Sequence, residues 1–308
     1  MSMNIVNNMK VMRALLLCGF VAGAGVVFAM GPGESGEFEY DGIRQIQVIS
    51  ETFDVDVEAT RGRQTSLEIR NQPDNYRILH ARSGDQLSIW VEREFSLLNR
   101  PHRGQLVLLV PGDADMRIEA STGDVRVRNL KSDRLEVDTS TGEVWIDSVS
   151  SSLSVDTSTG GVEINDSAGR FSVTTSTGDI QLRNTSGDIT AASSTGSHTY
   201  MNVIGDLSAR STTGRIEVDG IQGTLMLRTS TGNQRGRGIA LTGNSSFDSS
   251  TGSIEMDLRN DVESLEFDLR STTGSLQVGR ERSQRELYLG GTGFTIRGRS
   301  STGSQEYY

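Results

Sequence analysis

Apolar and polar residues alternate along most of the chain, in short runs separated by turns that contain glycine. The apolar pair Val144 and Ile146, for example, is followed nine residues later by the pair Leu153 and Val155. Alternation with a period of two, together with β-branched residues, is typical of strands that bury one face. Because no helix-length amphipathic segment follows residue 29, the pattern predicts an all-β protein.

A Ser/Thr-Thr-Gly tripeptide recurs from residue 121 onward, mostly at intervals of 18 residues. Its glycines are Gly123, Gly142, Gly160, Gly178, Gly196, Gly214, Gly232, Gly252, Gly274 and Gly303. A fixed period of this size is the signature of a solenoid, in which a coil buries its apolar pairs only by stacking on its neighbours. Glycine suits the tighter of the two turns because it tolerates a positive φ. We therefore expect a parallel β-solenoid (β-helix) with about 18 residues and two short strands per coil.

The first 29 residues have the order of a secretory signal peptide. Lys10 and Arg13 precede an apolar run, and Val27 and Ala29 occupy the small-residue positions of a cleavage site that leaves Met30 first. The run is short and rich in glycine for a membrane-spanning helix, which needs about 20 apolar residues. We predict a cleaved signal peptide over 1–29 and an exported protein of the periplasm, cell envelope or extracellular space. An uncleaved membrane anchor is the alternative.

Between the signal peptide and the regular repeats, the chain is less periodic. Residues 30–37 have the composition of a linker. Residues 38–112 are predicted to form irregular first coils or an N-terminal cap, with strands over 43–49, 53–59, 66–70, 86–92 and 105–110. Residues 113–308 hold the regular solenoid repeats, with loop insertions where the spacing lengthens after Gly232. Since the chain stops soon after Gly303, the far end is predicted to be an uncapped sheet edge, which favours association between solenoid ends.

Composition narrows the function classes. With 30 basic and 40 acidic residues and a formal charge of −10, the chain lacks the basic stripe that nucleic-acid binding normally needs. Its single cysteine excludes a disulfide scaffold and a cysteine-based zinc site. Only 34% of the residues are hydrophobic, which fits a thin, repetitive core better than a wide one. No motif implies a cofactor.

The serial turn units carry a family resemblance. The segments 121–125, 140–144 and 176–180 read Ser-Thr-Gly-Asp-Val, Ser-Thr-Gly-Glu-Val and Ser-Thr-Gly-Asp-Ile, and a Leu-Val-Pro segment at 109–111 precedes them. Over roughly residues 38–308 the chain resembles the bacterial putative-adhesin β-strand-repeat family (domain of unknown function 4097). The resemblance implies a β-helical, exported or envelope-associated protein with an adhesin-like role. The family has no agreed catalytic residues to transfer.

Recurrent carboxylates raise two chemical alternatives. Calcium β-rolls need acids in every repeat, but few of the residues after the turn glycines are acidic (Asp124, Glu143 and Asp179), so no metal site is expected. Asp138 and Asp156 occupy equivalent positions one coil apart, about 5 Å, near the separation that retaining glycosidases use. Their parity points outward, however, where burial does not raise a pKa. A β-helical carbohydrate-active enzyme using stacked carboxylates is the alternative to a noncatalytic role.

Polar residues also recur at inward positions. Thr139 and Thr157 precede the turn on the inward face, where threonines hydrogen-bonded from coil to coil are expected. His198 occupies an inward strand position, so it is predicted to be a packed core histidine and not a ligand.

Tryptophan supplies the candidate binding site. Trp145 lies between the inward residues Val144 and Ile146, so its ring should point outward, with Arg126 and Glu163 at the equivalent positions of the adjacent coils. An exposed tryptophan beside charged residues suits carbohydrate stacking or a protein contact. The same parity argument predicts an outward Trp90.

These observations predict a noncatalytic, exported, adhesin-like or scaffold protein of the cell envelope. Its repetitive surface would meet an envelope glycan or an envelope protein, or a second solenoid at its end. Nucleic acid is excluded as a partner, and a membrane contact is expected only if the N-terminal segment stays uncleaved.

Overall fold

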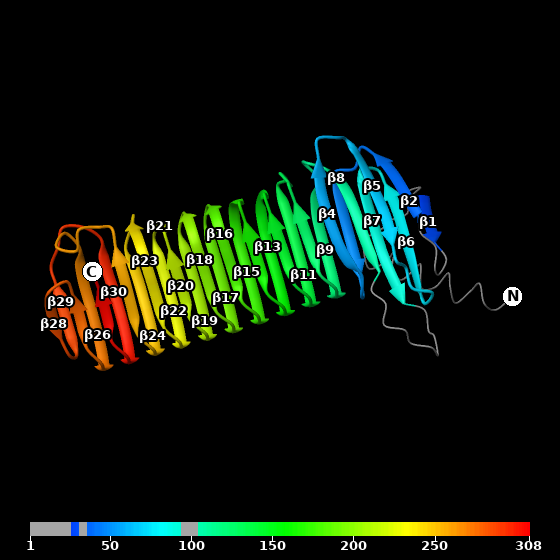
Figure 1. Ribbon diagram of the computed structural model, residues 1–308. Helices are drawn as coiled ribbons and strands as arrows, with labels where there is room; N and C mark the ends of the chain where they lie inside the picture. The colour runs from blue at the N-terminus through cyan, green and yellow to red at the C-terminus, as the bar shows by residue number, and fades with distance from the viewer. Residues whose placement is uncertain (1–25, 31–35, 94–103) are drawn as a thin grey trace.

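The protein is a straight rod of stacked β-coils with a broader cap at one end (Figure 1). This computed structural model describes residues 26–30, 36–93 and 104–308, and no helix occurs among them. None of these residues therefore forms an apolar helix that could cross a membrane. Residues 1–25, most of the predicted signal peptide, lie outside the described residues. Val26–Met30 is a strand.

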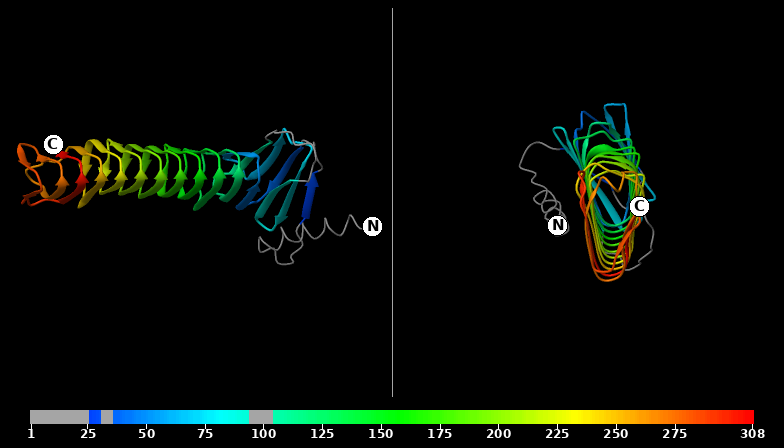
Figure 2. Two further views of the ribbon diagram at one scale, coloured as in Figure 1. Left: turned by 90° about the horizontal axis from the view of Figure 1, so that it is seen from below. Right: turned by 90° about the vertical axis from the view of Figure 1, so that its left-hand side faces the viewer.

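Each coil of the rod is flattened, with one strand on each of two faces, as the end-on view in Figure 2 shows. The strands of face 1, in spatial order along the rod, are β1 Val26–Met30, β6 Tyr76–Ser83, β7 Gln86–Arg93, β3 Gln45–Ser50, β9 Asp115–Thr122, β11 Arg134–Thr141, β13 Ser150–Thr159, β15 Ala168–Thr177, β17 Ile189–Thr195, β19 Leu207–Thr213, β22 Leu225–Thr231, β24 Ser245–Thr251, β30 Thr295–Thr302, β26 Glu266–Thr273 and β29 Glu286–Leu289.

The strands of face 2 follow the same spatial order. They are β2 Gly36–Asp41, β5 Gln64–Arg70, β8 Gln105–Pro111, β4 Asp54–Thr60, β10 Val125–Arg128, β12 Val144–Asp147, β14 Val162–Asn165, β16 Ile180–Ser186, β18 His198–Ile204, β20 Ile216–Asp219, β23 Gln234–Leu241, β25 Ile254–Leu258, β31 Gln305–Tyr307, β27 Leu276–Val278 and β28 Glu281–Ser283, with the short β21 Gln222–Gly223 pairing with β18 and β23.

The predicted parallel solenoid is confirmed. In the central coils each residue pairs with the one 18 positions further on: Leu153 with Phe171, and Phe171 with Ile189. The apolar residues therefore stack in columns between the two faces, and the buried residues form one core that runs along the rod. Because this core is only two side chains thick, a small hydrophobic fraction is enough to fill it.

Antiparallel strands close the N-terminal end, in the region where the sequence predicted irregular coils or a cap. The strand β3 lies between β7 and β9, and β4 lies between β8 and β10, so this coil is internal although it comes early in the chain. Outside it, β1, β2, β5 and β6 pair antiparallel. Gly36 and Glu37, which the sequence analysis placed in a linker, are the first residues of β2.

The C-terminal end is also closed, and the prediction of an uncapped edge after Gly303 was wrong. The last coil, β30 and β31, lies between the coil of β24 and β25 and the coil of β26 and β27 (Figure 1). Tyr307 is consequently buried in the core. The rod ends in β28 and β29, which pair antiparallel with β27 and β26. The long spacing between Gly274 and Gly303 reflects this reversed order of the last two coils.

The turn glycines form a column of close backbone contacts. Gly160 has a φ of +148°, and a Cβ added to it would lie 1.9 Å from the carbonyl oxygen of Gly142 in the coil before. Beside this column, buried hydroxyls support the turn: Thr139 donates to Thr157 over 2.8 Å, as predicted, and Ser211 donates to the carbonyl oxygen of Gly196 over 3.0 Å. The turn therefore depends on both glycine and the inward hydroxyl.

Candidate functional site

Trp145 lies on the outer surface of face 2, in one column with Arg126 and Glu163. The strand register pairs Arg126 with Trp145 and Trp145 with Glu163, as the repeat predicted. The guanidinium carbon of Arg126 lies 4.1 Å from the centre of the indole ring, in a cation–π contact. Arg126 therefore covers the side of the ring that faces the cap and holds the indole in one orientation.

On the other side of Trp145 the surface is hollowed. An open depression of about 510 Å³ extends from Trp145 over the next two coils and is lined by Glu143, Gly161, Glu163, Asp179 and Gln181 among others. We call it the Trp145 groove. Its depth beside the ring comes from Gly161, since a Cβ there would lie 2.6 Å from Glu143 Oε2. Sequence reasoning missed this role of Gly161, although the absence of a side chain after a turn glycine is visible in the repeat.

The carboxylates of the groove are held by hydrogen bonds. Glu143 Oε2 accepts from the backbone N–H of Gly161 over 3.0 Å, and Asp179 Oδ1 accepts from the N–H of Ser197 over 2.8 Å. Glu163 accepts from Arg183 over 3.1 Å. Each carboxylate has further acceptor capacity, so the groove combines a fixed aromatic ring with several oriented oxygens. Such a surface matches a ligand with an apolar face and several O–H or N–H donors.

The acids that follow turn glycines join one coil to the next. Asp124, Glu143 and Asp179 each accept a hydrogen bond from the backbone N–H at the equivalent position of the following coil. Sequence reasoning treated these acids only as metal candidates and missed this structural role. Within the described residues, no three His, Cys, Asp or Glu side chains are grouped to hold a metal ion.

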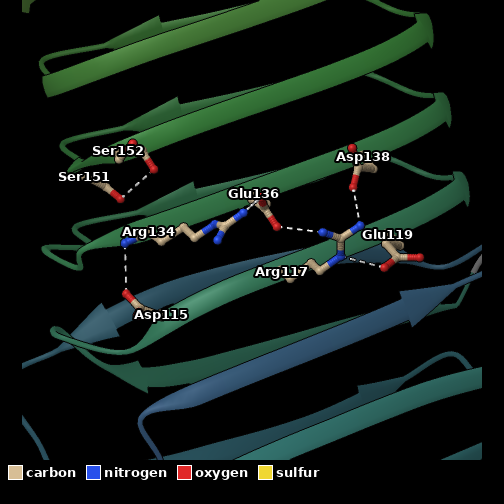
Figure 3. A network of polar contacts seen from close by, with 8 residues as sticks. All are labelled: Asp115, Arg117, Glu119, Arg134, Glu136, Asp138, Ser151 and Ser152. Atoms are coloured by element: carbon tan, nitrogen blue, oxygen red, sulfur yellow. Dashed lines mark hydrogen bonds and ion pairs between the residues drawn. The ribbon is translucent and has the colours of Figure 1, made fainter. Parts of the chain in front are cut away.

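The Asp138–Asp156 pair lies on the opposite face of the rod. The two residues are in register on β11 and β13, as the repeat predicted. Arg117 donates to Asp138 over 3.1 Å and to Glu119 and Glu136 over 2.7 Å each (Figure 3). Burial raises the pKa of the Asp138 carboxyl, while the charge of Arg117 lowers it and that of Asp156 raises it again. The partial burial of Asp138 was not expected from its parity.

Trp90 is not a surface residue, and its predicted exposure was wrong. Its side chain lies outside the main core, as the alternation requires. It is nevertheless only 5% exposed, because it packs with Leu79, Ala81 and Ile49 in a second, smaller cluster. Alternation reports which side of a sheet a residue occupies and not whether that side is covered.

His198 is fully buried, as predicted. Its Nε2 lies 2.8 Å from Ser193 Oγ and its Nδ1 lies 3.0 Å from the Tyr200 hydroxyl. Burial lowers its pKa to about 4. A neutral imidazole with both nitrogens occupied is a core residue and not a ligand.

Comparisons with known proteins support the family resemblance. Two solved structures are similar: a "putative adhesin" from Bacteroides fragilis, 14% identical with a TM-score of 0.40, and a "putative cell adhesion protein" from Clostridium sporogenes, 6% identical with a TM-score of 0.18. The first comparison covers 91% of this chain and 100% of the other, and the second covers 89% and 99%. No curated protein matches. The family model described as Toastrack DUF4097 matches residues 43–203 and 206–291, well over half of the chain, and the protein therefore belongs to the Toastrack DUF4097 family.

Proposed function

We propose that this protein is a noncatalytic, adhesin-like protein of the cell envelope that is exported and binds a glycan in the Trp145 groove. The observation that carries the proposal is the ring of Trp145, backed by Arg126 on one side and open to a hollow surface on the other. An immobilised aromatic ring beside fixed oxygen acceptors favours stacking of a sugar ring with its hydroxyl groups directed at the acceptors.

The charge of the groove restricts the ligand further. Glu143, Glu163 and Asp179 line the same groove as the indole ring of Trp145. These groups repel polyanions and favour neutral sugars or sugars that carry amine or amide N–H donors. We therefore expect binding to an uncharged or amino-sugar-containing envelope polysaccharide, and no binding to a phosphate-rich or sulfated polymer.

The alternative of a carbohydrate-active enzyme is less well supported. Asp138 has a raised pKa, which a general acid needs, but Arg117 already occupies its carboxylate. We therefore assign binding without cleavage, and the experiment below measures both.

The test is co-sedimentation of the purified protein with isolated envelope polysaccharide, with soluble sugar assayed in the supernatant. We expect saturable binding, no sugar release, and at least a tenfold loss of affinity in Trp145→Ala. The matched control is Glu306→Ala, which removes an exposed side chain from the same outward column of face 2 at the far end of the rod. Equal binding by Trp145→Ala and the wild type would refute the groove, and sugar release that disappears in Asp138→Asn/Asp156→Asn would establish the enzyme instead.

Fluorescence gives an independent readout because the chain has only two tryptophans. Trp90 is buried in the cap, whereas Trp145 is half-buried at the groove. Addition of a bound oligosaccharide should therefore change the emission of Trp145 alone. The change should be absent in Trp145→Phe and present in the Glu306→Ala control.

A further inference from the structure

A row of six side chains on the outer surface of face 1 changes from acidic to basic along the rod. The strands β11, β13, β15, β17, β19 and β22 are neighbours in this order (Figure 1), and their in-register outward residues are Asp138, Asp156, Thr174, Ala192, Arg210 and Arg228. We call these six residues the charge row. Its two halves carry opposite charges, two acids and two arginines, separated by two small uncharged residues.

The charges of this row are available to a partner. Asp156, Arg210 and Arg228 are exposed, and in the part of the chain that the structure describes none of the three forms an ion pair. Asp138 is half-buried and shares Arg117 with Glu119 and Glu136. The row therefore has unused capacity for ion pairs.

The middle of the charge row is flanked by small side chains, and the surface over Asp138, Asp156 and Thr174 is an open, shallow depression. In the four central coils of the row, those of Asp156 to Arg210, the neighbouring outward positions carry only small hydroxyl side chains. Two residues before the row these are Ser154, Ser172, Thr190 and Ser208, and two residues after it they are Ser158, Ser176, Ser194 and Thr212. No long side chain in these columns blocks the approach of a second copy. Serine and threonine also lose little conformational entropy on burial, in contrast to lysine or glutamate.

The charge row is complementary to itself when it is reversed. A two-fold axis that lies in the interface plane, parallel to the strands of face 1, and passes between Thr174 and Ala192 places Asp156 of one copy opposite Arg210 of the other and Asp138 opposite Arg228. Both pairings occur twice, as the symmetry of an isologous contact requires. We propose that two copies of this chain associate side by side and antiparallel through face 1, with the charge row at the centre of the interface.

The extent of the row limits the strength of this dimer. Six coils at about 4.8 Å and three outward columns span roughly 29 by 16 Å, so each copy buries on the order of 450 Å². This is about half of what a stable interface buries per partner, so the dimer should be weak, reversible and sensitive to salt. One step beyond the row, the same axis sets Glu119 of one copy opposite Asp248 of the other, so the favourable charge pairing ends with the six residues of the row.

The proposal is independent of the glycan site, which lies on face 2, and it predicts a charge-swap rescue. Protein produced from the full 308-residue chain should sediment as a monomer–dimer equilibrium at high concentration in 50 mM salt and as a monomer in 500 mM salt. Asp138→Arg/Asp156→Arg and Arg210→Asp/Arg228→Asp should each lower self-association at least tenfold, because each variant carries one sign along the whole row. An equimolar mixture of the two variants should restore the dimer as a heterodimer.

A matched control separates this surface from a general charge effect. Arg235→Asp/Arg237→Asp changes the net charge by the same amount as Arg210→Asp/Arg228→Asp, but on face 2. It should leave self-association unchanged. Circular dichroism confirms that each variant is folded, and restoration in the mixture is itself evidence of folding. A wild type that is monomeric at all concentrations in low salt would overturn the proposal. So would a dimer that survives both double substitutions, or a mixture of the two variants that stays monomeric.

Discussion

At the scale of single residues, three large polar side chains in the core of the rod lie where the neighbouring turn supplies a hydrogen-bond partner. His198 occupies an inward position that Gln234 and Gln305 fill in later coils. All three contact the inward hydroxyl beside the turn: His198 contacts Ser193, Gln234 contacts Thr229 and Gln305 contacts Ser300. Ile216 and Ile254 occupy the same column in the intervening coils, so this position accepts either an apolar side chain or a polar one that is bonded to the turn.

Two buried histidines, His198 and His80, determine how the stability of the fold is expected to depend on pH. Burial lowers the pKa of His198 and of His80 to about 4, below the ordinary value of 6.5. Because the unfolded chain binds these protons first, each histidine contributes stability that is complete above pH 6.5 and is lost as the pH falls towards 4, at most about 3 kcal/mol each. Urea unfolding at several pH values should show this loss. His198→Gln keeps the hydrogen bond to Ser193 and should remove roughly half of the dependence between pH 6.5 and 4, whereas an unchanged pH profile would contradict the assignment.

At the scale of the elements, the coil is defined by its two turns. One turn is the glycine column. The other contains a residue with a left-handed backbone at the same place in successive coils: Asn129, Ser148, Asp166, Asn184, Asn202 and Gly220. Some of these side chains bond to the coil before, as Asn184 does to Asp166 over 2.9 Å. Both turns are therefore fixed by backbone geometry that few residue types adopt.

Two adjacent glycines separate backbone constraint from the mere presence of glycine. Gly160→Ala places a Cβ 1.9 Å from a backbone oxygen at a φ of +148°, so we expect it to cost at least about 3 kcal/mol or to prevent folding. In Gly161→Ala the close contact is with the movable carboxylate of Glu143, and the nearest backbone atom, the carbonyl oxygen of Asp179, is 3.4 Å away, so the substitution should cost less than about 1.5 kcal/mol. Chemical denaturation of the two variants measures the difference. Equal effects would show that the stacked turn is not the source of the constraint.

The sequence predicted the coils well because their signals are local. Period-two alternation and the recurrent glycine identify the strands, the turns and the 18-residue register without knowledge of the rest of the chain. The groove at Trp145 was half predicted: the register gave its column with Arg126 and Glu163, but the hollow beside Gly161 depends on how side chains of three coils meet. The burial of Trp90 escaped prediction because the cluster around it brings together residues from β3, β6 and β7, which are distant in sequence.

At the scale of the whole molecule, the two ends of the rod are where prediction from the repeat failed. An order of coils that follows the sequence is the simplest expectation, but pairing between strands distant in sequence decides the actual order. Antiparallel strands cover both ends, so neither end presents an open parallel edge like the one predicted after Gly303. The surface that we propose for self-association is consequently the side of the rod and not its ends.

The N-terminal end also bears on export. Val26–Met30 pairs with β6 at the margin of the cap, and Phe28 stacks on His80 with 5.4 Å between ring centres. We expect N-terminal sequencing of the exported protein to begin at Met30, with the cap still folded because β1 is an outer strand. Ala29→Asp should block processing and leave the protein attached to the membrane. A wild-type protein that retains residues 1–29 would establish the uncleaved anchor.

The internal position of the last coil affects how the rod responds to tension. A load applied through Tyr308 does not act on the outermost layer, because β30 and β31 are hydrogen-bonded to a coil on each side. To leave the rod, residues 295–307 have to slide out between two layers, so both ladders are loaded in shear and break together. Peeling from an open edge would instead break one bond after another at low force. The reversal of two coils thus makes release of the last coil depend on breaking two ladders and not one.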